Sequence, residues 1–471
     1  MSILDWTVIV AYFIGLAIMV VLTRRAKTME DYAVGSRQIP GSIIFATLSA
    51  SFLGPGYVMG LANKAADKGY IWFCIFLAFS LQTILVGIFV APKLRHFDKA
   101  YSLGSVMGYR YGKAVQLLSG ILSVVLCAGV VGAISKASGD IISGFTGLPF
   151  IWAVIISIIV VLLYSTIGGI KTVIMTDVLQ FILLSVCVPL ILIIMLARHG
   201  ITDTMSLIPD TTKTLTGHFP PITLFSLFLS FFLGEALLPP YASRALMAKR
   251  KSDAKMGFLL SGCFSIAWFF VCASIGILAL GILPPGTENY YLGAMQTYLP
   301  IGVLGLAVAA MISIIMSSQD SFLNAASIAF SSDIAGVFSL KFVQGKKALG
   351  YSRMLNILIG IIAVAFATKV PSIIDALLYC YTLWAPTIVL PLVIALLRKQ
   401  VQPYAAFSAI ILGGVATGVW EWGLNNPYDI PSLLVGVLAN QVAFWSVSSL
   451  VKDIPKKGWF APLENKYWED K

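Results

Sequence analysis

Thirteen apolar stretches, each long enough to cross a lipid bilayer, constrain the fold of this chain more than any other feature. A helix of about 20 apolar residues spans the roughly 30 Å of hydrocarbon in a membrane. Hydrophobic residues make up 58% of the 471 residues and charged residues 11%, which is too apolar for a soluble core. The sequence therefore predicts an all-α polytopic membrane protein. The predicted spans are 4–23, 43–62, 70–91, 115–140, 149–167, 175–197, 221–243, 256–282, 300–331, 351–368, 372–397, 404–423 and 431–450.

The distribution of basic residues predicts how the chain crosses the membrane. Arg24, Arg25 and Lys27 follow the first span and do not precede it, so this span is not a cleavable signal and places residues 24–42 in the cytoplasm. Most of the 32 Lys and Arg fall on the segments that alternation then puts on the same side. We expect a plasma or bacterial inner membrane, with the N-terminus outside and the C-terminus cytoplasmic. The other cytoplasmic segments are 92–114, 168–174, 244–255, 332–350, 398–403 and the tail 451–471.

Several classes of function fit this sequence poorly. The net charge of +11 is spread over these cytoplasmic segments and forms no patch for nucleic acid. No His, Cys and carboxylate cluster has metal-ligand spacing, and no phosphate-binding glycine loop follows a strand. No Ser, His and Asp can be assembled at one membrane depth. We therefore expect no enzyme and no cofactor.

Asp320 lies inside the apolar segment 302–330, where a carboxylate is costly. Small polar residues recur around it at spacings of three or four, so one stripe of this helix is polar. A stripe of serines can also join two helices. Five small polar residues together with an acid favour an ion or substrate pathway instead. The residues of the stripe are Ser313, Ser317, Ser321, Asn324 and Ser327.

Two predicted spans contain helix breaks. Gly54, Pro55 and Gly56 interrupt the second span, and the segment 234–240, which ends in two prolines, interrupts the seventh. The two spans lie five apart, and an odd offset gives them opposite membrane orientations. This is the pattern of a five-plus-five inverted repeat, in which broken helices supply backbone ligands at mid-membrane.

Three segments resemble the sodium/solute symporter family, which includes sodium-coupled proline, sugar, sialate, pantothenate and choline transporters. They are GGIKTVIMTDVLQ (168–180), MSSQDSFLNAASIAFSSDI (316–334) and ASFLGPGYVMGL (50–61). The resemblance implies a LeuT-type inverted repeat with two broken helices and about 13 transmembrane helices. It divides the chain into a first helix and loop (1–42), two repeats (43–197 and 221–397), two peripheral helices (404–450) and the tail (451–471).

The resemblance also implies a main sodium site between the first broken helix and the helix of Asp320. Its oxygens would be the carbonyls of Ala50, Leu53 and Ile314 and the hydroxyls of Ser317 and Ser318. Neutral oxygens freed by an unwound helix suit this small hard cation. The alternative is that the paired serines bond back to the preceding turn.

A second ion site is implied by the same motifs. Its members would be Asp177, Asp320 and Ser321, with Ser317 shared. Two carboxylates at one site either hold a second sodium or share a proton, and the sequence leaves both open. In a simpler interpretation, Asp177 is only a helix N-cap in a cytoplasmic turn.

Substrate residues are expected at the two breaks. Gly54, Gly56 and Tyr57 come from the first break, Glu235 follows Gly234 in the second, and Trp72 is a candidate aromatic wall. A carboxylate at this depth favours an amine, amino acid or quaternary ammonium substrate. Alternatively, Glu235 pairs with Lys136 or is protonated. Lys136 and Asp140, four residues apart, are expected to form an ion pair, with a role in the outer vestibule as the second interpretation.

The most economical function is a symporter that imports a small polar solute with sodium by alternating access. Its expected partners are the solute, sodium as coupling ion and the lipid bilayer. A sugar or organic-acid symporter of the same family is the alternative within this class. A membrane sensor module is a different class, disfavoured because sensor relatives usually append a kinase region whereas residues 451–471 are short. A channel is the weaker third interpretation.

Overall fold

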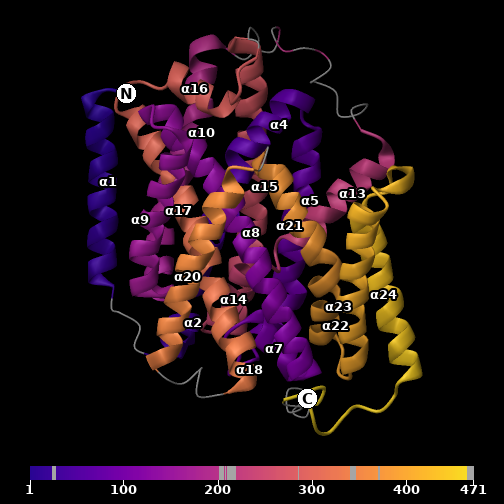
Figure 1. Ribbon diagram of the computed structural model, residues 1–471. Coiled ribbons are helices and arrows are strands. Elements are labelled where there is room, and N and C mark those ends of the chain that lie inside the picture. Colours follow the sequence, from indigo (N-terminus) through magenta and orange to yellow (C-terminus); the bar gives the residue numbers. More distant parts are fainter. Residues whose placement is uncertain are drawn as a thin grey trace.

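The computed structural model is built from helices that run roughly parallel to one axis (Figure 1). The N-terminus lies at one end of this bundle and the C-terminus at the other. Each of the thirteen predicted spans corresponds to one main helix or to two or three consecutive helical pieces. The structure describes residues 1–23, 28–200, 206, 208, 210, 219–284, 286–339, 346–369 and 372–463.

Eight of these spans are built on one main helix each. Within the described residues, eleven helices are long and apolar enough to cross a membrane, and a bent pair adds one more. The described apolar part of α9, Phe150–Leu163, is shorter. The eight helices are α1 (Ile3–Leu22), α8 (Lys113–Thr146), α9 (Phe150–Gly168), α10 (Ile170–His199), α15 (Lys251–Ile282), α17 (Val303–Ala329), α20 (Lys346–Ala367) and α24 (Ser432–Leu450).

Five spans consist of consecutive helical pieces. The second span is α3 (Gly41–Phe52), η2 (Gly56–Gly60) and α4 (Leu61–Lys68), bent by 63° at its break. The seventh is α13 (Pro221–Gly234) and α14 (Pro239–Met247), so both predicted breaks are confirmed. The other three are α5 (Ile71–Leu85) with η3 (Val86–Val90) and α6 (Ala91–Leu94), α21 (Ile373–Trp384) with η5 (Ala385–Val389) and α22 (Leu390–Leu397), and α23 (Pro403–Gly418) with η6 (Val419–Gly423).

Shorter helices cap the two ends of the bundle. At the end where the C-terminus lies are α2 (Met29–Val34), η1 (Gly35–Arg37), α7 (Leu103–Tyr111) and α18 (Gly336–Phe338), the last joined to α17 by η4 (Phe330–Ala335). At the opposite end α16 (Tyr290–Tyr298) covers the bundle, and η7 (Pro427–Asp429) connects α23 to α24.

The span of α17 is the most buried of the described membrane spans, and α1 lies at the edge of the bundle (Figure 1). In its most apolar window 78% of the residues of the α17 span are buried, against 17% for α1. The stripe predicted to be polar therefore faces protein and not lipid. Asp5 anchors α1 to the start of α17, because its carboxylate accepts the backbone N–H groups of Gly302 at 2.7 Å and Gly305 at 2.9 Å.

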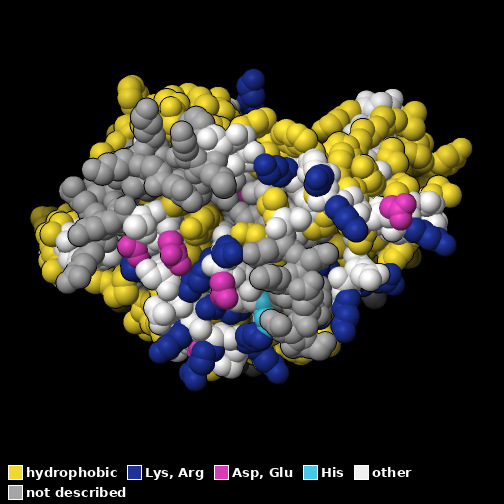
Figure 2. Space-filling model, turned by 90° about the horizontal axis from the view of Figure 1, so that it is seen from below, with side chains coloured by type: hydrophobic (Ala, Val, Ile, Leu, Met, Phe, Trp, Pro, Cys, Tyr) yellow, Lys and Arg dark blue, Asp and Glu magenta, His cyan; other side chains and the backbone are white. Residues whose placement is uncertain are grey.

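The end of the bundle that carries the C-terminus is basic (Figure 2). Lys249, Arg250 and Lys251 are exposed there, beside Arg95. The same end is closed by buried contacts. Arg37, only 6% exposed, donates to the carbonyls of Leu246 (2.9 Å) and Ala100 (2.7 Å) and so fastens the end of α14 to its neighbours.

Close helix contact makes one glycine of α15 irreplaceable on geometric grounds. A Cβ at Gly276 would lie 1.9 Å from the carbonyl oxygen of Ala62 in α4. We expect Gly276→Ala to destabilise the protein by about 1–3 kcal/mol, the usual cost of overpacking. Gly15→Ala is the matched control, because nothing lies within 4 Å of a Cβ there. Heating the purified protein and measuring the monodisperse fraction would compare them. Equal stability of the two variants would contradict this packing.

Candidate functional site

The break in the second span exposes backbone oxygens in the middle of the bundle. Helix α3 ends at Phe52, and Leu53 leaves helical geometry (φ −82°, ψ 45°). Helical geometry resumes at Pro55 and Gly56. The last carbonyls of a helix have no partner within that helix. The carbonyl of Ser51 is met from outside, by the hydroxyls of Tyr241 at 3.1 Å and Ser318 at 3.3 Å.

The serine pair of α17 faces this break, as the sequence predicts. The Ser317 hydroxyl lies 3.4 Å from that of Ser51, and a Cβ added at Gly54 would lie 3.1 Å from Ser318 Oγ. Ala50 and Ile314 are fully buried on the same two helices. The interpretation that the paired serines bond back to their own helix is wrong for both, because Ser317 donates to Asp177 at 2.5 Å and Ser318 to α3. Ser313, one turn earlier on the same helix, does bond back, because its hydroxyl donates to the Ala309 carbonyl at 2.7 Å.

Asp177 is a buried member of this group and not a helix cap. Its side chain is 0% exposed and accepts hydrogen bonds from the hydroxyls of Thr47 and Ser317. The N-cap interpretation is wrong because α10 begins at Ile170, five residues before the predicted start of the span, so Asp177 lies two turns inside the helix. The turn preceding it is only the glycine pair 168–169.

Arg244 is the main residue that sequence reasoning missed. It was expected at the start of the cytoplasmic loop 244–255, yet it lies in α14 and is 1% exposed. Its Nη2 approaches Asp177 Oδ2 at 3.3 Å, Ser321 Oγ at 2.7 Å and Ser51 Oγ at 3.2 Å. The signal available in the sequence was the short distance from Arg244 to the second predicted break, 234–240.

Asp320 is fully buried on α17. Tyr12 of α1 lies near both Asp320 and Asp177. Of the three residues expected at a second ion site, Asp177 and Ser321 share one partner, the guanidinium of Arg244.

Glu235 lies at the second break, directly after the last residue of α13, and is 2% exposed. The hydroxyls of Tyr57 and Tyr241 lie beside its carboxyl group. The next residue, Ala236, donates its backbone N–H to Gln82 Oε1 at 2.8 Å, which satisfies part of the unwound backbone. The two breaks thus meet, because Tyr57 belongs to the first and Glu235 to the second.

An aromatic cluster surrounds Tyr57 at this meeting point. Its ring centroid lies 5.1 Å from that of Phe76 and 5.4 Å from that of Phe269, and its hydroxyl lies 3.3 Å from that of Tyr381. Phe231 of α13 joins the cluster, 4.5 Å from Phe76 and 5.9 Å from Tyr381. Aromatic residues are frequent in such chains, so their sequence positions alone gave no reason to group these four with Tyr57.

Among the described residues, two charged groups toward the α16 end of the bundle, Lys136 and Lys64, have partners other than Glu235. Lys136 pairs with Asp140 at 3.3 Å, which confirms the expected ion pair and makes its alternative pairing with Glu235 wrong. Trp72 lies toward the end of the bundle that carries α16, where Lys64 Nζ lies 5.5 Å from its ring centroid. Trp72 still adjoins the aromatic cluster, 6.1 Å from Phe76.

A polar vestibule of about 760 Å³ opens at the end where α16 lies. Lys136, Asp140, Glu288 and Lys64 line it. The ion pair of Lys64 with Asp375, 3.1 Å long, joins α4 to α21 beside it. The vestibule is wide enough for a small solute.

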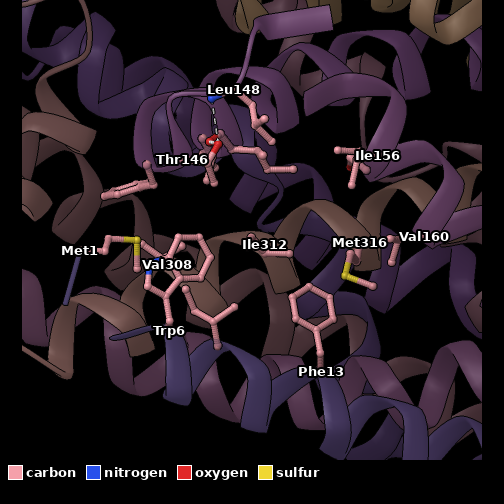
Figure 3. A pocket seen from close by; sticks show the side chains of 15 residues that line it. Met1, Trp6, Phe13, Thr146, Leu148, Ile156, Val160, Val308, Ile312 and Met316 are labelled. Atoms are coloured by element: carbon pink, nitrogen blue, oxygen red, sulfur yellow. Dashed lines mark hydrogen bonds between the residues drawn. The ribbon is translucent and has the colours of Figure 1, made fainter. Parts of the chain in front are cut away.

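An almost wholly apolar groove of about 430 Å³ lies beside α17, between α1, α8 and α9 (Figure 3). Trp6 and Phe13 come from α1, Ile156 from α9 and Met316 from α17. Its lining offers no set of converging polar groups, so it lacks the chemistry of a solute site.

The family is decided by the match over most of the chain. The model of the sodium:solute symporter family matches residues 32–413. The chain belongs to this family. Among curated relatives of this symporter, the sodium/glucose cotransporter 1 of Ovis aries is 23% identical over 511 residues, covering 92% of this chain and 75% of the relative. The sodium/sialic acid symporter NanT of Aliivibrio fischeri is 23% identical over 454 residues, covering 90% and 83%.

Solved structures give the fold of the symporter. A substrate-bound, outward-open Na+-coupled sialic acid symporter superposes with a TM-score of 0.79 at 20% identity, covering 96% of this chain and 98% of that one. The nucleobase-cation symporter Mhp1 gives 0.61 at 11% identity, covering 89% and 95%. The fold is therefore the LeuT-type inverted repeat with two broken helices. The protein is a multi-pass sodium-coupled symporter and not an enzyme.

The buried pair of Arg244 and Asp177 leads to a test of stability. Removing one partner of a buried pair strands the other charge, at a cost of about 3–5 kcal/mol. We expect Arg244→Gln to lower thermal stability strongly, and Asp177→Asn in the same chain to restore much of it. The control is Lys171→Gln, because the pair of Lys171 with Asp31 is partly exposed, at 41% and 28%, and worth about 1 kcal/mol or less.

Melting curves of the purified variants measure this, with stability followed by intrinsic fluorescence. If the double variant is no more stable than Arg244→Gln alone, the two side chains are not energetically coupled and the ion pair is incidental.

Proposed function

We propose that this symporter imports a small organic cation, an amine or quaternary ammonium compound, together with sodium. The observation that carries this proposal is Glu235, a carboxylate 2% exposed at the meeting of the two helix breaks, beside Tyr57 and its aromatic neighbours. A buried carboxylate is costly unless a cation pairs with it. Lys136, the lysine that sequence reasoning offered, is bound to Asp140.

The aromatic neighbours fit the same substrate. Rings around an anionic group form the type of site that holds ammonium groups, because the ring faces attract cations. Tyr57, Phe76, Phe231 and Tyr381 supply ring faces within one connected cluster. Gly54 and Gly56 let the break pack closely within this site, since an added Cβ would lie 3.1 Å from Ser318 Oγ at Gly54 and 2.7 Å from the Leu377 side chain at Gly56. Trp72, 6.1 Å from Phe76, forms the wall at the edge of this site in the proposal.

The relatives named for glucose and sialic acid supply the alternative, a sugar or organic-acid symporter. A neutral sugar offers no charge to Glu235, and an anion is repelled by an ionised carboxylate. The residue therefore distinguishes the two substrate classes, and the chemistry of the site favours the cation.

Sodium is proposed to bind between the first break and α17. The carbonyls of Ala50, Leu53 and Ile314 and the hydroxyls of Ser317 and Ser318 are its ligands in this proposal, and Ser317 and Ser318 lie against the break as required. Asp177, Asp320 and Ser321 are candidates for a second ion, either sodium or a proton, in a conformation in which Arg244 no longer occupies the Asp177 group.

The direction of import depends on the orientation of the chain. The end of the bundle that carries the C-terminus is the basic one (Figure 2), which by the positive-inside rule makes it cytoplasmic. The vestibule then opens to the outside, and the N-terminus lies outside as well.

Glu235→Gln tests the substrate. The change removes the charge and keeps the shape, so affinity for an organic cation should fall at least about ten-fold while sodium binding without substrate persists. Glu288→Gln is the control, because Glu288 is an acid of the vestibule outside the aromatic cluster. Thermal-shift screening of the parent against amines, amino acids, sugars and organic acids, with and without sodium, identifies the ligand first.

Two results would overturn the assignment. One is a parent that is stabilised by a sugar or an organic anion and by no cation. The other is a Glu235→Gln variant that binds the cationic ligand as the parent does.

Ser317→Ala and Ser318→Ala test the sodium site. Each deletes a proposed hydroxyl ligand with little change in volume, so sodium-dependent uptake should collapse and substrate affinity should fall with it, because coupled sites influence each other reciprocally. Ser313→Ala is the control on the same stripe, since that hydroxyl is bound to Ala309. Uptake into proteoliposomes under an imposed sodium gradient is the measurement.

Normal sodium dependence in both variants would remove Ser317 and Ser318 from the site. Uptake by the parent that follows pH and ignores sodium would make a proton the coupling ion.

A further inference from the structure

The end of the Arg244 side chain is surrounded by oxygen atoms from three helices. Nη2 lies 2.7 Å from Ser321 Oγ of α17, 3.2 Å from Ser51 Oγ and 3.5 Å from Thr47 Oγ1 of α3, and 3.3 Å from Asp177 Oδ2 of α10. Arg244 and Asp177 are 1% and 0% exposed. One carboxylate and three hydroxyls thus converge on one positive group, out of contact with solvent.

This set of oxygens is also a ligand set for a small hard cation. Such ions are bound by carboxylate and neutral oxygens, and hydroxyls from separate helices can rotate to suit either occupant. The oxygens are held from three helices, so they do not depend on α14 for their placement. Only the guanidinium itself comes from that short helix.

The group is continuous with the proposed sodium site. The Ser317 hydroxyl donates to Asp177 at 2.5 Å and lies 3.4 Å from that of Ser51. The Ser317 side chain therefore belongs to the proposed sodium site and also contacts the oxygens around Arg244. A second cation at Asp177 cannot share the space that the guanidinium fills, and the two positive charges repel each other.

We propose that Arg244 is the resident cation of the Asp177 group and excludes a second sodium from it while α14 is packed as in this structure. The symporter then binds a single sodium ion in this conformation, at the Ser317 and Ser318 site. The inference rests on sodium coupling and on that proposed sodium site, and it is independent of the substrate.

Helix α14 controls the exclusion. Arg244 is anchored within its own helix, with Nη1 on the Pro240 carbonyl at 2.8 Å. The far end of the helix is fixed by Arg37 on the Leu246 carbonyl and by Ile39 N–H on the Met247 carbonyl at 3.2 Å. The guanidinium leaves Asp177 only if these contacts or the helix itself give way.

Counting bound sodium tests the proposal. The purified full-length protein is titrated with radioactive sodium at constant ionic strength in potassium chloride, and the number of ions bound per molecule at saturation is measured. We expect one ion for the parent, two for Arg244→Gln, and one for the double variant with Asp177→Asn, which has lost the carboxylate. Arg244→Lys keeps a positive charge and should stay at one.

A parent that binds two ions, one of which is lost in Ser321→Ala, overturns the proposal, because sodium then occupies the group beside Arg244. A folded Arg244→Gln variant that still binds one ion overturns it too. If Arg244→Gln fails to fold, the parent and Ser321→Ala decide, and both should bind one ion. A parent that binds none would remove the Ser317 site instead, and the extra ion in Arg244→Gln would still be expected.

Discussion

Hydrocarbon cannot hydrogen-bond to a backbone, and every other feature of this symporter follows from that constraint. An interrupted helix is tolerated only where protein or a ligand satisfies the exposed groups. The break after Phe52 meets that condition because Ser318 and Tyr241 both donate to the Ser51 carbonyl. The polar stripe of α17 is therefore buried at the centre of the bundle, and the break and the stripe require each other.

The two breaks form one connected site with two chemistries. At the first, hydroxyls and carbonyls are neutral and suit sodium; at the second, Glu235 sits beside Tyr57 and Tyr241 and suits an organic cation. Tyr241 links them physically, because its hydroxyl donates to the Ser51 carbonyl while lying next to the Glu235 carboxyl. A substrate that draws Tyr241 toward Glu235 would change the oxygen available at the proposed sodium site, which is a short route for coupling the two ligands.

The sequence predicted the spans, both breaks and the Lys136 to Asp140 pair, because apolar length, proline and glycine, and a spacing of four are local signals. It failed where the answer depends on which helices meet. Asp177 was placed near a helix end, since apolar content alone does not show that α10 begins at Ile170. Arg244 was placed in a loop, because basic residues after a span usually lie there. Only the packing of α14 against α3, α10 and α17 shows that it is buried on Asp177.

The position of Arg244 gives the basic end of the molecule a role beyond orientation. Arg37 and Arg244 are both buried at α14. Arg37 donates to the carbonyl of Leu246 near the end of this helix, and Arg244 extends from the helix to Asp177. Helix α14 is fastened at this end by Arg37, so a path toward the basic end that runs past this helix opens only if α14 moves. Any such movement withdraws a positive charge from beside Asp177 and from the neighbourhood of Ser317. The electrostatic environment of the proposed sodium site is thus tied to whether the basic end is closed, so ion affinity and conformation change together.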